Sequence, residues 1–265
     1  VFLRPLGLRL EQRKLILLAN DDGYSAPGIN RLMEWLTPIA DVFVMAPDRA
    51  RSGAAGSITS EIPITCNKIS EAPGLTVYSC SGTPVDCVKL AVDEIMPRRP
   101  DLVVSGINHG DNAAINVHYS GTMGAALEAA MLRLKSVAFS LCDHRLDADF
   151  TPLRPYVERI TREALMRPMP ELTCLNVNFP LAPEFEGVRI CRMCKCLWSK
   201  EYEKYTNPRR GNSYYFLTGN CTNMEPDRED TDRWALEHGY VAITPTQIDV
   251  TAYHLAEDMK NWDIF

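Results

Sequence analysis

The sequence predicts an α/β fold in which helices cover both faces of a mostly parallel sheet. Short apolar runs bounded by turn residues alternate with segments of helical periodicity, a pattern that favours parallel strands joined by right-handed crossovers. The first run, residues 15–19, is typical of a central strand buried on both faces. The 265 residues, 46% hydrophobic and 23% charged, suffice for one large domain with a small appendage.

The next segments predict a βαβ unit and a hairpin. Apolar residues recur at helical spacing after Pro27-Gly28, which indicates a helix over 29–36. A second strand is expected over 41–46, and a less regular stretch predicts hairpin strands at 62–69 and 75–80.

Thr83-Pro84-Val85-Asp86 is typical of a helix start. It combines an N-cap, a proline in the first helical position and an acid in the first turn, so we expect a helix from there to about Met96. Apolar patterning places the later elements of the core: strands at 102–106, 137–141 and 174–179, and helices at 123–134 and 152–166.

The composition and periodicity of the sequence change from about residue 187. Tyrosines, prolines and an acidic run replace helical periodicity, which predicts an irregular, partly β extension projecting from the core. A last strand is expected over 239–244 and a short closing helix over 253–262. We therefore divide the chain into a core, 14–186, and an extension, 187–265, which returns to the core. Residues 1–13 are expected to be an extension that precedes the core. They are not expected to form a signal peptide, because the apolar stretch is short and is interrupted by Pro5 and Arg9.

Composition excludes several classes of partner. A net charge of −6 argues against a general nucleic-acid-binding surface, which needs a basic field. No apolar stretch approaches the roughly 20 residues that span a bilayer, so no membrane partner is expected. Nine cysteines, an odd number scattered through expected strands and helices, favour reduced thiols and a cytoplasmic location.

The segment Cys191-Arg192-Met193-Cys194-Lys195-Cys196 contains a spacing that zinc sites use. No matching second pair follows, and Cys191 and Cys194 would point to opposite faces if residues 188–198 form one strand. A structural role for these thiols is favoured, and a structural zinc protein centred on Cys191, Cys194 and Cys196 stays as an alternative.

Polar residues mark the end of the first strand, where Asn20, Asp21, Asp22 and Gly23 follow the apolar run. Open α/β sheets bind ligands at this edge. Two adjacent carboxylates repel each other, and a bound cation would neutralise them. An ordinary solvated turn explains the same residues about equally well.

Three further polar clusters are expected at the same edge. Residues 46–53 supply Ser52, Gly53 and two arginines; residues 105–110 supply the amide oxygen of Asn108, a hard ligand, beside His109; and residues 119–124 open a helix whose N–H groups suit phosphate. Each is ordinary loop chemistry alone, but their convergence favours a site. The motifs of dinucleotide folds, P-loops, nucleophile elbows and HExxH zinc enzymes are absent from the sequence.

Taken together, these motifs resemble the SurE (survival protein E) family of metal-dependent nucleotidases. The resemblance is carried by five ordered segments within residues 15 to about 140: Asn20-Asp21-Asp22-Gly23, Ala46-Pro47-Asp48-Arg49 with Arg51-Ser52-Gly53, Gly82-Thr83-Pro84, Ser105-Gly106-Ile107-Asn108, and Tyr119-Ser120-Gly121-Thr122. It is looser in the last third.

The resemblance implies a Rossmann-like three-layer α/β/α core with a β-hairpin arm and a swapped C-terminal tail that build homodimers or homotetramers. It also implies one divalent cation per subunit, Mg²⁺ or Mn²⁺, and nucleoside monophosphates as substrates. His109 and Asp111 depart from the small residues commoner in the family, which affects the expected substrate preference.

The site residues expected on this basis fall into three groups. The catalytic pair is Asp21 and Asp22. The metal ligands are Asp21, Asp22, Ser52 and Asn108. The phosphate and substrate contacts are Asn20, Gly53, Ser105, Gly106, His109, Ser120, Gly121 and Thr122.

The chemistry expected is phosphoryl transfer, in which positioning and charge neutralisation dominate. The pair would orient or deprotonate a water molecule, or one aspartate would attack phosphorus; both routes stay open. A non-catalytic nucleotide-binding module on the same fold, and a phosphatase acting mainly on other phosphate esters or polyphosphate, are the alternatives.

Overall fold

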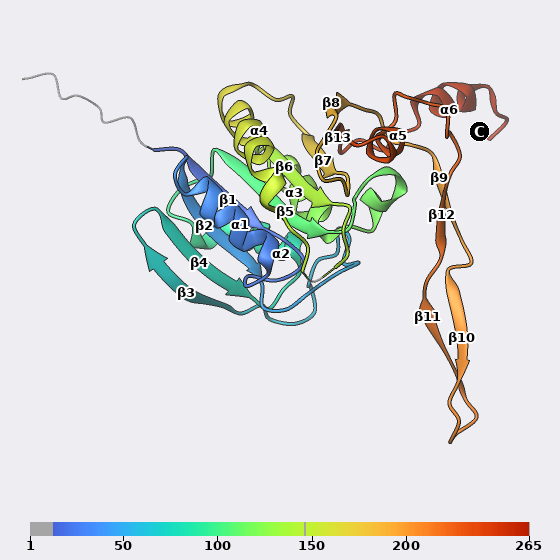
Figure 1. Ribbon diagram of the computed structural model, residues 1–265, viewed down its shortest axis with the longest axis horizontal. Helices are drawn as coiled ribbons and strands as arrows, with labels where there is room; N and C mark the ends of the chain where they lie inside the picture. Colours follow the sequence, from blue (N-terminus) through green and yellow to red (C-terminus); the bar gives the residue numbers. More distant parts are fainter. Residues whose placement is uncertain (1–12, 146, 265) are drawn as a thin grey trace, which may run out of the picture.

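The computed structural model describes residues 13–145 and 147–264 as a three-layer α/β/α domain from which a long β arm projects (Figure 1). The residues expected to precede the core lie, apart from Arg13, outside this part of the chain. A nine-stranded sheet forms the middle layer in the order β3-β4-β2-β1-β5-β6-β7-β13-β8. Its strands are β1 Leu15–Ala19, β2 Asp41–Pro47, β3 Cys66–Ala72, β4 Leu75–Cys80, β5 Leu102–His109, β6 Ser136–Leu141, β7 Thr173–Phe179, β8 Gly187–Ile190 and β13 Tyr240–Gln247.

The helices alternate with these strands, as the sequence predicts. They are α1 Pro27–Leu36, α2 Pro84–Leu90 continued by the π-helical turn η1 Ala91–Ile95, the 3₁₀ helix η2 Ala114–His118, α3 Gly121–Met131, the 3₁₀ helix η3 Thr151–Leu153, α4 Arg154–Met166, α5 Asp232–Glu237, α6 Tyr253–Asp258 and the 3₁₀ helix η4 Met259–Asn261. The predicted N-cap begins α2, and with Asp86 it forms a capping box: the Thr83 hydroxyl accepts from the Asp86 N–H, and the Asp86 carboxylate accepts from the Thr83 N–H.

The sheet is mostly parallel, with two antiparallel pairings. Parallel pairings join β2, β1, β5, β6 and β7 in succession, whereas β3 pairs antiparallel with β4, and β13 pairs antiparallel with β7. The α/β class with a mostly parallel sheet is therefore confirmed.

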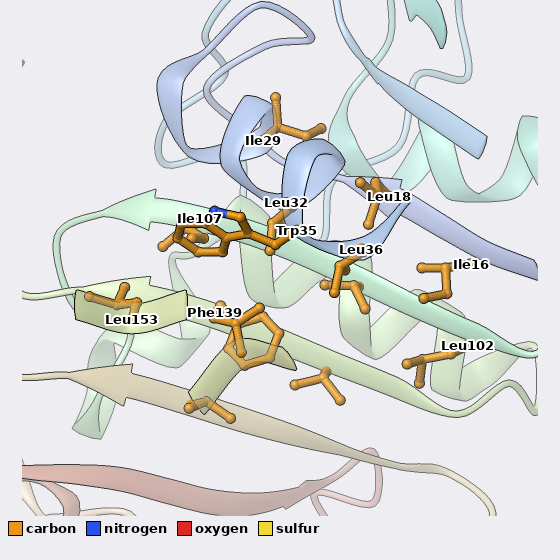
Figure 2. Packing of buried hydrophobic residues seen from close by; sticks show 14 of the residues in the cluster. Ile16, Leu18, Ile29, Leu32, Trp35, Leu36, Leu102, Ile107, Phe139 and Leu153 are labelled. Atoms are coloured by element: carbon orange, nitrogen blue, oxygen red, sulfur yellow. The ribbon is translucent and has the colours of Figure 1, made fainter. Parts of the chain in front are cut away.

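Alternation along β1 divides the core into two layers. Ile16 and Leu18 face a cluster under α1 and α4 (Figure 2), while Leu15 and Leu17 face a second cluster under α2 and α3. Both faces of the strand are thus buried, which explains its uninterrupted apolar run.

Most boundaries differ from expectation by one to three residues, and three differences bear on the architecture. β3 begins at Cys66 rather than residue 62, because its register is set by the tight turn at Pro73-Gly74, where Gly74 has φ +78°. β5 continues to His109 instead of ending at Gly106, since pairing with β6 resumes after an irregularity between Ser105 and Asn108. α6 does not close the core: none of its residues is buried.

The arm lies between β8 and α5. It consists of two short antiparallel pairs, β9 Cys196–Ser199 with β12 Asn220–Asn223 at its base and β10 Tyr202–Thr206 with β11 Ser213–Leu217 at its tip (Figure 1). The structure thus contains the expected hairpin. None of the described helices is long and apolar enough to span a membrane.

Candidate active site

The turn after β1 is built to present two carboxylates. The Asn20 side chain donates to the carbonyl of Gly23 (2.9 Å) and accepts from the Gly23 N–H (3.1 Å), so it holds the turn closed. Gly23 has φ +105°, and a Cβ there would lie 3.3 Å from the Pro47 carbonyl oxygen. Asn20 is 1% exposed, so in this structure its side chain holds the turn that contains Asp21 and Asp22.

Asp21 is buried against the start of α3. Its side chain is held by the Thr122 hydroxyl, which donates to Oδ1. Only glycine fits at position 121, because a Cβ there would lie 2.7 Å from the Asp21 Cβ. Burial raises the pKa of Asp21 to about 6; the hydrogen bond from Thr122 opposes this, and the charge of Asp22 adds to it.

Asp22 faces the end of β5. Its Oδ2 lies 3.4 Å from Nδ1 of His109, whose ring packs edge-on against Phe150. Among the described residues, Nε2 of His109 is buried without a hydrogen-bond partner. The pair connects the two strand ends that carry Asp22 and Asn108.

The loop after β2 brings Ser52 beside the carboxylates. The Arg51 N–H donates to the Asp21 carbonyl (2.6 Å), which ties this loop to the turn after β1. The Arg51 guanidinium donates to the Ser81 carbonyl, so it is directed to the loop after β4. Ser52 and Gly53, next along the chain, are exposed.

Asn108 and Ser120 complete the edge. The amide nitrogen of Asn108 donates to the Gly110 carbonyl (2.8 Å), which leaves its oxygen available as a ligand. Ser120 is the N-cap of α3 and accepts from the Met123 N–H (2.9 Å), as expected of a helix start.

These side chains share one cavity of about 530 Å³, a volume typical of small-molecule sites. It lies at the carboxyl ends of β1 and β5, where parallel sheets bind ligands. Six of the residues expected from the sequence line it: Asp21, Ser52, Gly53, Asn108, His109 and Ser120.

The other expected residues are not part of the cavity lining. Asp22 contacts His109, and Asn20, Gly121 and Thr122 support Asp21. Ser105 and Gly106 are buried within β5, where a Cβ on Gly106 would lie 2.3 Å from the Phe139 carbonyl oxygen. Ser105 and Gly106 thus pack β5 against β6 in this structure.

The site residues expected from the sequence left out much of the cavity lining. The remaining lining comes from the loop before α3, from the segment after β6 and from the arm: Asp111, Asn112, Asn116, Tyr119, His144, Trp198, Glu201, Tyr202, Leu217 and Thr218. The sequence places Tyr119 in a segment expected at this edge and the resemblance links Asp111 to substrate preference, and proximity to Tyr119 could have suggested Asn116. Nothing local marks Trp198 or Tyr202, because only the return path of the arm brings them here.

The cysteine segment is not one strand, contrary to the premise used for it. Residues 191–195 lie between β8 and β9, where Arg192 N donates to the Asp230 carbonyl (2.9 Å) and Cys194 N donates to the Asp232 carboxylate (2.9 Å). All nine cysteines are free thiols. No group of three His, Cys, Asp or Glu side chains in the described ranges is placed to hold a metal ion, which leaves the zinc alternative without a site there.

A family model described as "Survival protein SurE" matches residues 16–200, a span that includes every site residue expected from the sequence. The chain belongs to the SurE family. A protein named 5'-nucleotidase SurE from Phocaeicola vulgatus is 52% identical over 254 residues, 96% of this chain and 98% of that protein. A protein of the same name from Symbiobacterium thermophilum is 38% identical, covering 94% of this chain and 98% of that protein.

A solved structure of the family has the same fold. The crystal structure of SurE protein from Aquifex aeolicus superposes with a TM-score of 0.79 at 36% identity, covering 93% of this chain and 98% of that one. The resemblance drawn from the five sequence segments is therefore confirmed.

Proposed function

We propose that this protein is a 5'-nucleotidase that hydrolyses nucleoside monophosphates to nucleoside and phosphate with one divalent cation per subunit, Mg²⁺ or Mn²⁺. The observation that carries the proposal is the convergence of Asp21, Ser52, Asn108 and Ser120 on one cavity at the carboxyl edge of the sheet. Membership of the SurE family, with relatives about 50% identical named 5'-nucleotidase SurE, supports an enzyme of this class.

The donor set suits a small hard cation. Carboxylate, hydroxyl and amide oxygens are the ligands that Mg²⁺ and Mn²⁺ prefer. The buried carboxylate of Asp21, next to Asp22, carries a raised pKa that a bound cation would relieve. Asp21, Asp22, Ser52 and Asn108 would hold the cation, so hydroxyl and amide oxygens supply half of this set.

The chain's own residues then position the reaction. Ser120, the N-cap of α3, lines the cavity, and its hydroxyl would bind a non-bridging phosphate oxygen. Ser52 and Gly53, exposed on the loop opposite, would close around the same group. When bound, the cation supplies charge neutralisation on the phosphate and a more acidic water.

The two aspartates would have different roles in the reaction. Asp21 is fixed by Thr122 and lines the cavity, which suits it to take a proton from the attacking water or to attack phosphorus itself. Asp22 is held beside His109 and is better placed as a ligand alone.

Phosphate release from a panel of nucleoside monophosphates tests the proposal. We expect hydrolysis with Mg²⁺ or Mn²⁺, complete loss after chelation and recovery when either cation is restored. Binding of nucleotides without any hydrolysis would favour a regulatory module instead. Higher kcat/KM on polyphosphate or simple phosphate esters would assign the protein to another substrate class.

We further propose that the arm and the C-terminal segment join subunits into a homodimer or homotetramer. Large aromatic side chains at the arm tip are exposed, Tyr214 at 41% and Phe216 at 58%. Tyr253 of α6 is 64% exposed, and no residue of that helix is buried. Exposed apolar groups in this number typify an interface between subunits.

A further inference from the structure

Two chemically different groups of side chains line the cavity. The turns after the core strands supply the oxygen-bearing side chains of Asp21, Ser52 and Asn108, here called its inner end. The arm supplies Trp198 and Tyr202, and the loop before α3 adds Tyr119; these aromatic side chains are here called its outer end. A molecule that fills this cavity therefore meets both oxygen ligands and aromatic rings.

Trp198 is held in one orientation by polar contacts. Its indole N–H donates to Oδ1 of Asn116 (3.0 Å), and the amide nitrogen of Asn116 donates to Asp111 (3.2 Å). Asp111 in turn forms an ion pair with Arg233 (3.4 Å), at the start of α5. These contacts join the arm, the loop after β5 and α5, so the ring is fixed before any ligand binds.

Backbone packing supports the indole on another side. Gly219, immediately before β12, has φ +114°, and a Cβ there would lie 3.1 Å from Cε3 of Trp198. Only a glycine lets the backbone approach the ring so closely. An aromatic ring that is fixed on one side and lines a cavity on another is a preformed stacking surface.

Building on the proposed function, we infer that Trp198, flanked by Tyr202 and Tyr119, is the surface on which the substrate's nucleobase stacks while its phosphate lies at the inner end. Every base has a flat π face, so stacking tolerates all of them. The site would thus prefer nucleotides to non-aromatic phosphate esters and discriminate only weakly among bases.

The test compares two substrates that differ only by the base. The kcat/KM ratio of AMP to ribose 5-phosphate is measured for the unaltered protein and for Trp198→Ala. Loss of one stacked base predicts a fall in this ratio of about 5- to 150-fold. Trp198→Phe retains an aromatic ring and should keep most of the ratio. Tyr215→Ala removes an exposed aromatic side chain of β11 outside the cavity lining and should not change it.

A binding measurement separates this inference from the proposed function. Adenosine alone should quench tryptophan fluorescence in the unaltered protein, and Trp198→Phe should remove that quenching while the other three tryptophans remain. Quenching without any phosphate release would retain the stacking surface and reject the nucleotidase. Hydrolysis of AMP with the same substrate ratio in Trp198→Ala would reject the stacking surface and retain the nucleotidase. Equal loss on both substrates, with Trp198→Phe equally impaired, would make Trp198 merely structural.

Discussion

The hydroxyl of Thr122 donates a hydrogen bond to Oδ1 of Asp21, joining the first turn of α3 to the turn after β1. Both side chains are buried, Thr122 at 0% and Asp21 at 4% exposure. Thr122 thus acts as a positioning residue for the Asp21 carboxylate. Its hydrogen bond keeps the pKa of Asp21 lower than burial alone would set it.

Replacing Thr122 with valine should destabilise the metal-free protein more at high pH than at low pH. A buried carboxylate that loses a donor costs about 1–3 kcal/mol. Below its pKa of about 6, Asp21 is protonated and needs that donor less. Urea unfolding near pH 7.5 and near pH 5 measures the difference. Thr122→Ser, which keeps the hydroxyl, is the control, and an equal cost at both pH values would contradict this role.

Asp21→Asn should stabilise the metal-free protein near neutral pH. The folded-state pKa of Asp21 is about 6 against a usual value of 3.8, so the folded chain binds the proton more tightly and stability falls as the pH rises from about 4 to about 6. At neutral pH the ionised group therefore costs about 3 kcal/mol, which asparagine avoids. Thermal unfolding in chelator measures the gain.

In thermal unfolding, added cation should stabilise the unaltered protein more than Asp21→Asn. Mg²⁺ or Mn²⁺ stabilises whichever folded protein binds it, by mass action. We expect a higher Tm on adding cation to the unaltered protein and little change in Asp21→Asn. Glu61→Gln, which alters an exposed carboxylate away from the site, should respond like the unaltered protein. Equal cation-induced shifts in all three would remove Asp21 from the ligand set.

Metal titration of activity should separate the two aspartates. Asp22→Asn keeps one oxygen ligand, so excess cation should recover part of its rate. Asp21→Asn should stay about 10²–10⁴-fold slower at saturating cation, because a metal cannot replace a base or nucleophile. Equal recovery of both variants would leave the pair as ligands only.

Asp101 offers a stability test remote from the site. Burial raises the pKa of its carboxyl, but hydrogen bonds from Lys14, the Leu15 N–H and Arg98 outweigh burial and bring it to about 2. The stabilisation is therefore present above about pH 4 and is lost as the pH falls toward 2. Asp101→Asn should cost about 2 kcal/mol at neutral pH. Urea unfolding at neutral pH and near pH 2 would show whether the cost disappears in acid.

Removing the tip of the arm should reduce the size of the assembly. A variant that replaces residues 203–216 with a short glycine linker keeps Trp198, Tyr202 and Leu217 at the cavity. It lacks most of the exposed aromatic residues of β10 and β11. Light scattering should report fewer chains per particle than for the full chain. The same number of chains in both would exclude the tip as an interface.

The core elements could be predicted because their signals are local. The apolar run of β1, the N-cap and proline at the start of α2, and the alternation of strands and helices each specify an element without reference to distant residues. Parallel strands then place Asp21, Ser52 and Asn108 on one edge by topology alone. For that reason the inner end of the cavity could be anticipated.

The outer end of the cavity could not be predicted, because it depends on a long-range contact. Trp198 meets Asn116 across 82 positions of sequence, and nothing near Trp198 marks it as part of a site. The extension of β5 beyond Gly106 was not predicted for a related reason. The uninterrupted apolar run stops at Val104, and Asn108 and His109 belong to the strand because they pair with Ser140 and Leu141 of β6.

The arm leaves the core after β8 and returns to β13, and these two strands are neighbours in the sheet. Both of its attachment points are therefore fixed by the sheet, and the chain between them can change in length without shifting the register of any core strand. Lengthening a flexible connection has a small entropic cost that grows only logarithmically. The reach of the arm and the chemistry at the strand ends can consequently evolve at different rates.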